Sequence, residues 1–328
     1  MRQDMSIQFI VSAGPEFGLG HLRRMQAVAR AYRNRGGKGK IDFYLIGCGP
    51  GERIACENDE RDGVMIAGDC SSLTDLCQDL QHAVIIFDLH KKHIGKILYH
   101  CSQRLRLLDR YVVAIDNVAI QADMHADLRW VPSFYKNPDW PDHLEIHYGW
   151  DHYLIDKKLE TAPLPNKNRL LVLTGGSDVA GLGNIWPQMF EKHTEHSLEI
   201  HWVQGPFSKN PVIPSMNKNK FILHRSLKGL DEVINICDGI LSVYGISVFE
   251  ALMYGRPCVV YNPYVDPSNP EMLALKASGY VAVAQDADHA IRLAGNMFSE
   301  GALPTAQQNN QVSPIDGLGV HRLLERIN

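Results

Sequence analysis

The chain has 328 residues, 45% of them hydrophobic, and a formal net charge of −4. A chain of this length is long enough for about two domains, each with an ordinary hydrophobic core. The slightly acidic balance gives no overall attraction to nucleic acid or to an anionic membrane, so we expect no nucleic-acid partner.

The seven cysteines are scattered and include no Cys-x-x-Cys pair. This usage favours reduced thiols and argues against a disulfide framework or a zinc knuckle. Residues 1–6 are polar, unlike a signal peptide, and no apolar run approaches the ~18 residues of a membrane span. We therefore expect a cytoplasmic protein.

A glycine-rich corner follows the first predicted strand, Ile7–Ala13. The motif Gly18-Leu19-Gly20-His21-Leu22-Arg23-Arg24 leads there into a helical pattern that ends at Gly36-Gly37. A strand that enters a helix through such a turn forms an anion-binding corner, because free backbone N–H groups and the helix dipole point the same way. His21 can also accept a proton near neutral pH, which indicates chemistry as well as binding. The alternative is that His21 only packs or caps the helix start.

Further short apolar strands are separated by segments that can be helical. We expect them at residues 41–47, 64–68, 83–88 and 111–116. This alternation predicts a parallel sheet wound on both faces, whose strand carboxyl ends form a ligand crevice. Asp88, His90, Asp116 and Asn117 are therefore candidate crevice residues. Alternatively, each aspartate only caps the helix that follows it.

The middle of the chain changes character. Residues 126–160 are rich in aromatic residues and proline, so we expect irregular structure there, followed by an inter-domain linker at residues 160–168.

The second half repeats the first. Strands are expected at residues 169–173, 198–204, 221–224, 239–243 and 257–261, a loose loop at 300–313 and a final helix at 320–327. Small-residue corners follow the first and fourth of these strands. Gly175, Gly176 and Ser177 form one corner, and Gly245 and Ser247 form the other, from which a helix carrying Glu250 continues.

We therefore predict an α/β protein of two doubly wound, Rossmann-like domains facing a cleft. The N-terminal domain spans residues 1–160, the C-terminal domain 161–314, and a C-terminal helix 315–328. Such a cleft suits a nucleotide linked to a second group, because one domain can hold the nucleotide while the other presents His21.

Four motifs carry a family resemblance. Gly18 to Arg24, Ala114-Ile115-Asp116-Asn117, Leu173 to Asp178 and Asp316-Gly317-Leu318-Gly319 resemble, in order, those of the UDP-sugar hydrolases of pseudaminic acid biosynthesis. Those enzymes have the GT-B fold and are similar to the peptidoglycan N-acetylglucosaminyltransferase. The resemblance spans nearly the whole chain.

The resemblance implies a mechanism without a cofactor. UDP would occupy the C-terminal domain, with Glu250 on the ribose and the backbone around Gly175, Gly176 and Gly245 on the diphosphate. His21 would deprotonate a water molecule for attack at the anomeric carbon, in the synthesis of a surface polysaccharide or nonulosonic acid. The substrate-binding residues implied or predicted are Gly18, Gly20, Arg24, Asp88, Asp116, Asn117, Gly175, Gly176, Ser177, Gly245, Ser247 and Glu250.

Two other functions remain open. In a glycosyltransferase, an acceptor hydroxyl replaces water, and the basic, amphipathic residues 90–110 could contact anionic lipid peripherally; alternatively, they form a solvated helix face. In an inactive binding homologue, activity is lost because the chain departs from the family pattern at Tyr244, Ile246 and Glu271. We infer no obligate protein partner.

No metal site is expected. The pair Asp286 and Asp288 has the spacing of a metal-binding motif but is better explained as the N-terminal cap of a helix. The histidines between His82 and His100, and those at 143, 147 and 152, lack a recurring ligand spacing, so we expect structural or surface roles for them.

Overall fold

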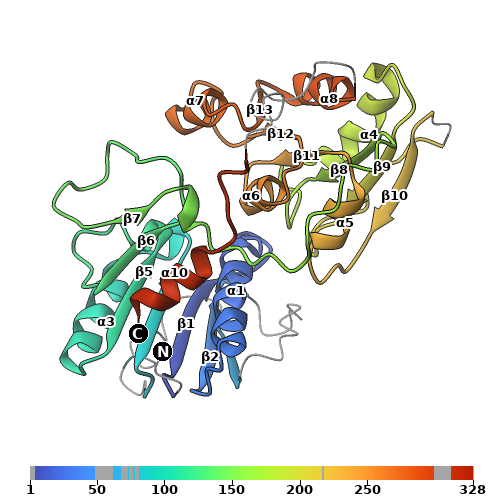
Figure 1. The fold of residues 1–328 in the computed structure, drawn as a ribbon. Coiled ribbons are helices and arrows are strands. Elements are labelled where there is room, and N and C mark those ends of the chain that lie inside the picture. Colours follow the sequence, from blue (N-terminus) through green and yellow to red (C-terminus); the bar gives the residue numbers. More distant parts are fainter. Residues whose placement is uncertain are drawn as a thin grey trace. The chain divides into compact units, whose positions relative to one another are not determined.

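The computed structural model describes residues 4–48, 62–67, 73, 77, 81–215, 218–298 and 312–327. The chain forms two compact units (Figure 1). Unit 1 comprises Met1–Asp156 and Gly317–Asn328, and unit 2 comprises Lys157–Asp316. Most of the loop expected at 300–313 lies outside the described residues.

Unit 1 is built on a parallel sheet with the strand order β3-β2-β1-β4-β5-β6-β7. Its strands are β1 (Ile7–Ser12), β2 (Ile41–Ile46), β3 (Gly63–Ala67), β4 (Val84–Asp88), β5 (Tyr111–Ile115), β6 (Leu128–Val131) and β7 (His147–Tyr148). The described helices are α1 (Gly20–Asn34), α3 (Lys96–Leu107) and α10 (Gly319–Arg326), with 3-10 turns η1 (Lys91–His93), η2 (Asp116–Val118) and η3 (Trp150–His152). The inner strands β1, β2, β4, β5 and β6 are short, mostly apolar runs buried on both faces, as expected for a parallel sheet covered by helices, whereas the edge strands β3 and β7 are partly exposed.

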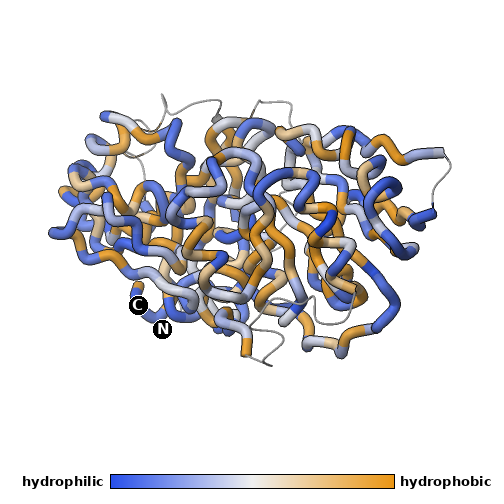
Figure 2. Tube along the Cα trace, turned by 90° about the horizontal axis from the view of Figure 1, so that it is seen from above, coloured by the Kyte–Doolittle hydropathy of each residue, from blue (hydrophilic) through white to orange (hydrophobic). Residues whose placement is uncertain are grey.

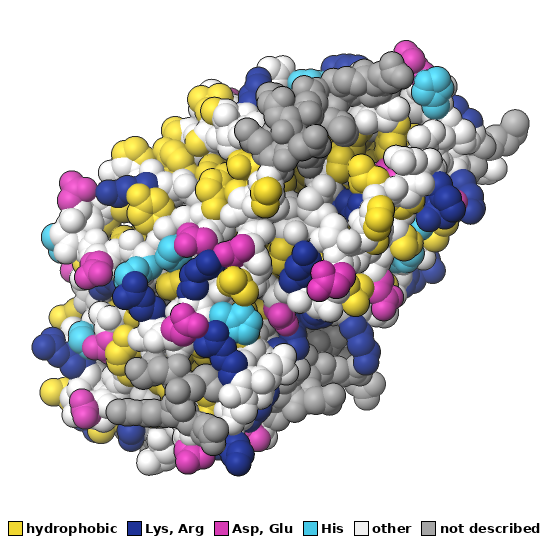
Figure 3. All heavy atoms as spheres, in the orientation of Figure 1, with side chains coloured by type: hydrophobic (Ala, Val, Ile, Leu, Met, Phe, Trp, Pro, Cys, Tyr) yellow, Lys and Arg dark blue, Asp and Glu magenta, His cyan; other side chains and the backbone are white. Residues whose placement is uncertain are grey.

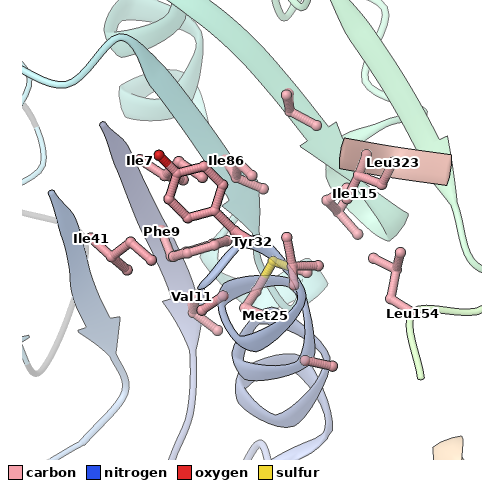
Figure 4. Close-up of a cluster of buried hydrophobic side chains, with 14 of the residues drawn as sticks. Ile7, Phe9, Val11, Met25, Tyr32, Ile41, Ile86, Ile115, Leu154 and Leu323 are labelled. Atoms are coloured by element: carbon pink, nitrogen blue, oxygen red, sulfur yellow. The ribbon is translucent and has the colours of Figure 1, made fainter. Parts of the chain in front are cut away.

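The core of unit 1 explains why α1 forms where it does. Met25 and Tyr32, which lie on one face of α1, pack with Phe9 and Val11 of β1 in one buried cluster (Figure 4). The same cluster includes Leu323 of α10, so the C-terminal helix completes the core of the N-terminal unit. Gly319 makes this possible, because a Cβ there would lie 2.2 Å from the carbonyl oxygen of Tyr153.

The expectation of irregular structure throughout residues 126–160 is wrong in part. β6 pairs parallel with β5, with Val113 opposite Leu128 and Ile115 opposite Trp130, and β7 pairs with β6. These strands have only four and two residues, so they give little periodic signal between the prolines. Their pairing depends on the sheet already formed by β5.

Unit 2 holds a second parallel sheet, in the order β10-β9-β8-β11-β12-β13. Its strands are β8 (Arg169–Leu173), β9 (Glu199–Val203), β10 (Lys220–His224), β11 (Gly239–Val243), β12 (Cys258–Tyr261) and β13 (Ala282–Ala284). Its described helices are α4 (Leu182–His193), α5 (Asp231–Ile236), α6 (Ile246–Met253), α7 (Pro270–Ala277) and α8 (Ala287–Asn296). Along the chain, hydrophobic stretches alternate with hydrophilic ones, and several of the hydrophilic ones lie in outer turns (Figure 2).

Both sheets reverse their strand order at one point. In unit 1 the reversal lies between β1 and β4, and in unit 2 between β8 and β11. In doubly wound sheets, ligands bind outside the carboxyl ends of the strands at this topological switch point. The predicted α/β fold class is confirmed. The two switch points are the candidate ligand sites of this fold.

The basic segment 90–110 uses most of its apolar side chains internally. Leu98 and Leu105 of α3 lie in the second core cluster of unit 1, and Ile94 and Ile97 pack against it. Leu107, 78% exposed, stays on the surface. Acidic and basic side chains are interspersed on the face shown in Figure 3. None of the described helices is both long and apolar enough to cross a bilayer.

Candidate functional site

The loop after β1 is shaped by a tight glycine turn. Gly14 and Gly18 pair through their backbones, at 2.8 and 3.2 Å, and have φ angles of 145° and 69°. A Cβ on Gly14 would lie 2.2 Å from the carbonyl oxygen of Gly47, so only glycine fits there. The sequence reasoning did not single out Gly14, although its Gly-Pro dipeptide is a turn signal.

His21 and Asp88 meet at the switch point of unit 1. His21 is the second residue of α1, and Asp88 is the last residue of β4. Nδ1 of His21 lies 2.8 Å from Oδ1 of Asp88, whose side chain is fully buried. The His21 side chain is 12% exposed. The two residues therefore form a histidine–carboxylate dyad that reaches the surface through the imidazole ring.

Arg24 ties the dyad to a second carboxylate. Its Nε and Nη2 donate to the two oxygens of Asp88 at 2.5 Å each, and Nη2 also donates to Oδ2 of Asp116 at 2.7 Å. Burial alone would raise the pKa of Asp88, but the positive charge of Arg24 and the hydrogen bonds from Arg24 and His21 keep that pKa below its usual value. Burial opposes the charge of Arg24 as well, yet Asp88 and Asp116 raise its pKa. The guanidinium and Asp88 are therefore both ionised.

The hydrogen-bond network assigns the proton on the His21 ring. Nδ1 faces both the Asp88 carboxylate and Nη2 of Arg24, each at 2.8 Å. A carboxylate can only accept, whereas Arg24 already donates to two carboxylate oxygens. A proton on Nδ1 therefore satisfies Asp88 and leaves the lone pair on Nε2.

Asp116 approaches Arg24 in an uncommon backbone conformation. Its φ angle is 58°, in the left-handed region that aspartate enters more readily than most residues. It is the first residue of η2, and the neighbouring Asn117 uses its carbonyl oxygen to accept from Gln121. The structure thus unites four predicted residues, His21, Arg24, Asp88 and Asp116. Among the described residues, the Asn117 side chain forms no hydrogen bond with these four.

The same cluster is the group of possible metal ligands found in the described part of the chain. One donor atom each of His21, Asp88 and Asp116 lies within 4.8 Å of the others. Arg24 already supplies a cation to both carboxylates, so a metal ion would have to displace its guanidinium. The chemistry of the cluster thus favours an arginine-neutralised site, and the expectation that no metal takes part stays a prediction.

Two further histidines lie beside this corner. The backbone N–H of His90 donates to the buried hydroxyl of Ser12 at 2.8 Å, and Ser12 Oγ also contacts Nδ1 of His93 at 2.7 Å. The Phe17 ring packs against both imidazoles, with centroid distances of 5.1 and 4.4 Å. From the sequence, only His90 was a candidate crevice residue, because it follows a strand, and spacing alone predicted structural roles for the histidines of this segment. The contacts of His90 and His93 with Ser12 of β1 join distant parts of the chain, so no local pattern reveals them.

In unit 2, the corner after β8 is formed mainly by backbone groups. Gly175 has a φ angle of 86°, and a Cβ on Gly205 would lie 2.3 Å from the Gly175 carbonyl oxygen. Asp178 closes the loop by accepting from the backbone N–H groups of Leu182 and Gly183 at the start of α4. Gly176 and Ser177 lie between these fixed points.

The second corner of unit 2 connects β11 with α6. Gly245 precedes α6, and nothing lies within 4 Å of the place a Cβ would take. Ser247 belongs to the first turn of α6. Glu250 is its fifth residue and is partly buried. Tyr244 Oη donates to Glu271 at 2.7 Å, so two of the departures from the hydrolase pattern contact each other.

Two other features lie apart from these corners. Asp286 caps α8 by accepting from the N–H of His289, which confirms its capping role, while Asp288 pairs with His193 and Arg292. A cavity of about 400 Å³ opens near the amino ends of β5, β6 and β7. The cavity lining includes none of the predicted site residues.

Known proteins resemble this chain more clearly in fold than in sequence. No protein-family model matches the chain. An uncharacterized protein of Methanocaldococcus jannaschii, MJ1062, is 23% identical over 319 residues, which cover 87% of this chain and 63% of that protein. The chain thus spans less than two thirds of that relative.

Solved structures are similar over the whole chain. MurG of Acinetobacter baumannii gives a TM-score of 0.60 at 13% identity, covering 99% of both chains. CalG4, the calicheamicin glycosyltransferase, gives 0.59 at 13% identity, covering 100% of this chain and 98% of CalG4. MnaA of S. aureus, solved with UDP, gives 0.58 at 12% identity, covering 98% and 96%. The chain therefore has the GT-B fold, as predicted, whereas identities this low do not reach the narrower hydrolase family.

Proposed function

We propose that the protein is a nucleotide-sugar hydrolase that releases UDP from a UDP-linked amino or deoxy sugar. The observation that carries this proposal is the His21–Asp88 dyad at the switch point of unit 1. A dyad of this kind holds a general base in a fixed tautomer and orientation, as the reaction requires. The resemblance of the ordered motifs to the UDP-sugar hydrolases supports the choice of substrate.

The network around Asp88 suits proton transfer. Two carboxylates, Asp88 and Asp116, surround one guanidinium, Arg24, which leaves one net negative charge next to the His21 ring. That charge can stabilise the imidazolium formed when Nε2 takes a proton. Arg24 in turn keeps the buried Asp88 ionised and fixes its direction through a bidentate contact.

The proposed reaction is a displacement at the anomeric carbon. A water molecule gives its proton to Nε2 of His21, and its oxygen forms the new bond to carbon. The bond between that carbon and the phosphate oxygen breaks, and UDP leaves with the electron pair. The products are the free sugar and UDP.

We propose unit 2 as the site of the nucleotide. The corner at Gly175 and Gly176 and the open Gly245 at the start of α6 offer backbone N–H groups to a diphosphate. Ser247 adds a hydroxyl, and Glu250 on the same helix is proposed to accept from the ribose hydroxyls. The MnaA structure with UDP supports a nucleotide ligand for a fold of this kind.

The test is release of UDP from a panel of UDP-linked amino sugars, in EDTA and without any acceptor. We expect turnover in EDTA, and His21→Asn to lower it about 10²–10⁴-fold while UDP affinity stays the same. The matched control is His100→Asn on the exposed face of α3, which should keep full activity. Unchanged turnover in His21→Asn would remove the proposed base.

A glycosyltransferase is the second candidate. The same dyad can deprotonate an acceptor hydroxyl, and CalG4 is a glycosyltransferase of this fold. Turnover that requires an added acceptor would favour this candidate. Contact of residues 90–110 with anionic lipid belongs to it as well, and sedimentation with anionic vesicles tests that contact. UDP binding without turnover of any sugar nucleotide would favour an inactive homologue.

A further inference from the structure

His90 is held next to the proposed base by three separate contacts. Its backbone N–H donates to the buried Ser12 hydroxyl at 2.8 Å, and its ring packs on Phe17. Nδ1 of its ring accepts from the backbone N–H of Lys92 at 3.3 Å, which makes His90 the N-terminal cap of η1. The side chain therefore has a fixed position and a fixed ring orientation.

The cap determines which ring nitrogen carries the proton. Because Nδ1 accepts from Lys92, the neutral ring holds its hydrogen on Nε2. Among the described residues, no group bonds to Nε2 of His90. This N–H is available to a ligand.

His90 and His21 form a complementary pair. Their ring centroids lie 6.3 Å apart, and the rings are nearly perpendicular, at 84°. His21 presents a lone pair on Nε2, because its Nδ1 faces Asp88, while His90 presents an N–H. One ring can thus accept a proton while the other donates a hydrogen bond to a neighbouring oxygen.

We propose that His90 is a substrate-contacting residue whose Nε2–H donates a hydrogen bond to an oxygen of the sugar and so sets the reacting carbon opposite His21. This inference rests on the proposed function and names the residue that positions the glycosyl group. Because His90 lies in unit 1, it acts on the sugar and not on the nucleotide bound by unit 2.

Two substitutions separate this role from a structural one. Asparagine can keep the cap on Lys92 but lacks the distal N–H, whereas the longer glutamine places an amide N–H near the position of Nε2. We expect His90→Asn to lower kcat/KM for the UDP-sugar about 10–100-fold, with unfolding midpoint and UDP affinity unchanged. His90→Gln should recover most of the loss. Equal loss in both variants, or no loss in His90→Asn, would overturn the proposal.

A second measurement is independent of turnover. Nitrogen-15 NMR of labelled histidines reports the tautomer of each ring, with His90 assigned from the His90→Asn spectrum. A proton on Nε2 of His90 supports the proposal, and a proton on Nδ1 overturns it. If the wild-type protein releases UDP from no sugar nucleotide, the proposed function fails. The role of His90 is then decided by the tautomer and by whether His90→Asn binds a UDP-sugar more weakly than the wild type.

Discussion

The two units share one strand order but place different groups at their switch points. At the switch point of unit 1, ionised side chains from α1, β4 and η2 bond to one another around the buried carboxylate of Asp88. At the switch point of unit 2, glycines and one capping aspartate, Asp178, leave backbone groups to form the corner. A charged side-chain network suits proton transfer, whereas an open backbone corner suits a phosphate. The same sheet order thus presents charged side chains at one switch point and mostly backbone groups at the other.

The difference predicts which substitutions disturb folding and which disturb binding. A buried ion pair that loses one partner leaves an uncompensated charge, so changes at Asp88 or Arg24 should destabilise the protein. At Gly20 and Gly245 an added Cβ would meet no atom within 4 Å, so substitution by alanine there should leave the fold intact.

The largest effect is expected from breaking the unit 1 network. Asp88→Asn or Arg24→Met should each lower the free energy of unfolding by about 3–5 kcal/mol, because the first leaves Arg24 paired with Asp116 alone and the second leaves the buried Asp88 without a cationic partner other than the His21 ring. The double variant should lose less than the sum, since neither charge then remains. Urea unfolding at pH 7 measures all three. Additive losses would show that the two side chains are not coupled.

A smaller effect is expected from two buried arginines that hold loops. Arg129, 8% exposed, donates to the carbonyl oxygens of Ala119, Gln121 and Met124, and Arg256, 1% exposed, donates to those of Ala162 and Asn235. Replacing either by Met should cost about 2–3 kcal/mol, because buried carbonyls lose their donors.

These two variants also separate the units functionally. The loop held by Arg129 follows η2, which begins with Asp116, so Arg129→Met should lower kcat as well as stability. Arg256→Met should lower stability alone, since it holds the segment that enters unit 2. Thermal unfolding and UDP release measure both properties, and a loss of kcat in Arg256→Met would contradict this division.

The acid response of the two aspartates should have opposite signs. The folded-state pKa of Asp88 lies below its usual value, so its contribution to stability is complete above pH ~4 and is lost as pH falls through the folded pKa. Burial raises the pKa of Asp178, although hydrogen bonds from Gly183 and Leu182 oppose this rise. The folded state therefore holds this proton more strongly than the unfolded chain does. As a result, stability falls as the pH rises from ~4 through the raised folded-state pKa.

One proton contributes a slope of at most about 1.4 kcal/mol per pH unit. Asp88→Asn should therefore flatten the loss of stability below pH ~4, whereas Asp178→Asn should remove a fall in stability that occurs as the pH rises above ~4. Urea unfolding from pH 3 to 6 measures both, with the wild type as reference. Changes of the same sign in the two variants would contradict the assignment.

Much of this architecture could be predicted from the sequence because it depends on local patterns. A window of a few residues is enough to predict the short apolar strands, the helix through Leu22 and Tyr32, and the glycine turns after strands. The choice of Asp88 and Asp116 followed from a topological rule about strand ends, which the sheet order obeys, and His21 was chosen from the glycine-rich corner after the first strand. The Asp286 cap was also readable, because capping is a contact between neighbours.

The rest depends on contacts between distant segments. β6 and β7 form only because β5 offers an edge, and Gly14 is required by Gly47 of another loop. Arg24 was predicted to bind substrate, yet in the structure its guanidinium joins two carboxylates from different strand ends. His90 gains its tautomer from η1 and its place from Ser12. No spacing along the chain encodes such partners.

The smallest effect on stability is expected at the two open glycines, where the comparison is sharpest. Gly20 is the first residue of α1, and Gly245, in extended backbone, precedes α6; neither has an atom within 4 Å of the position that an added methyl group would take. Gly→Ala should therefore change the free energy of unfolding by no more than about 1 kcal/mol at either site. The added methyl instead fills space that a ligand would use. Gly20→Ala should lower kcat/KM for the UDP-sugar with UDP affinity intact, and Gly245→Ala should weaken UDP itself, as titration calorimetry can measure. If both variants weakened UDP equally, the nucleotide would not belong to unit 2 alone, and the division between a catalytic and a nucleotide-binding unit would have to be redrawn.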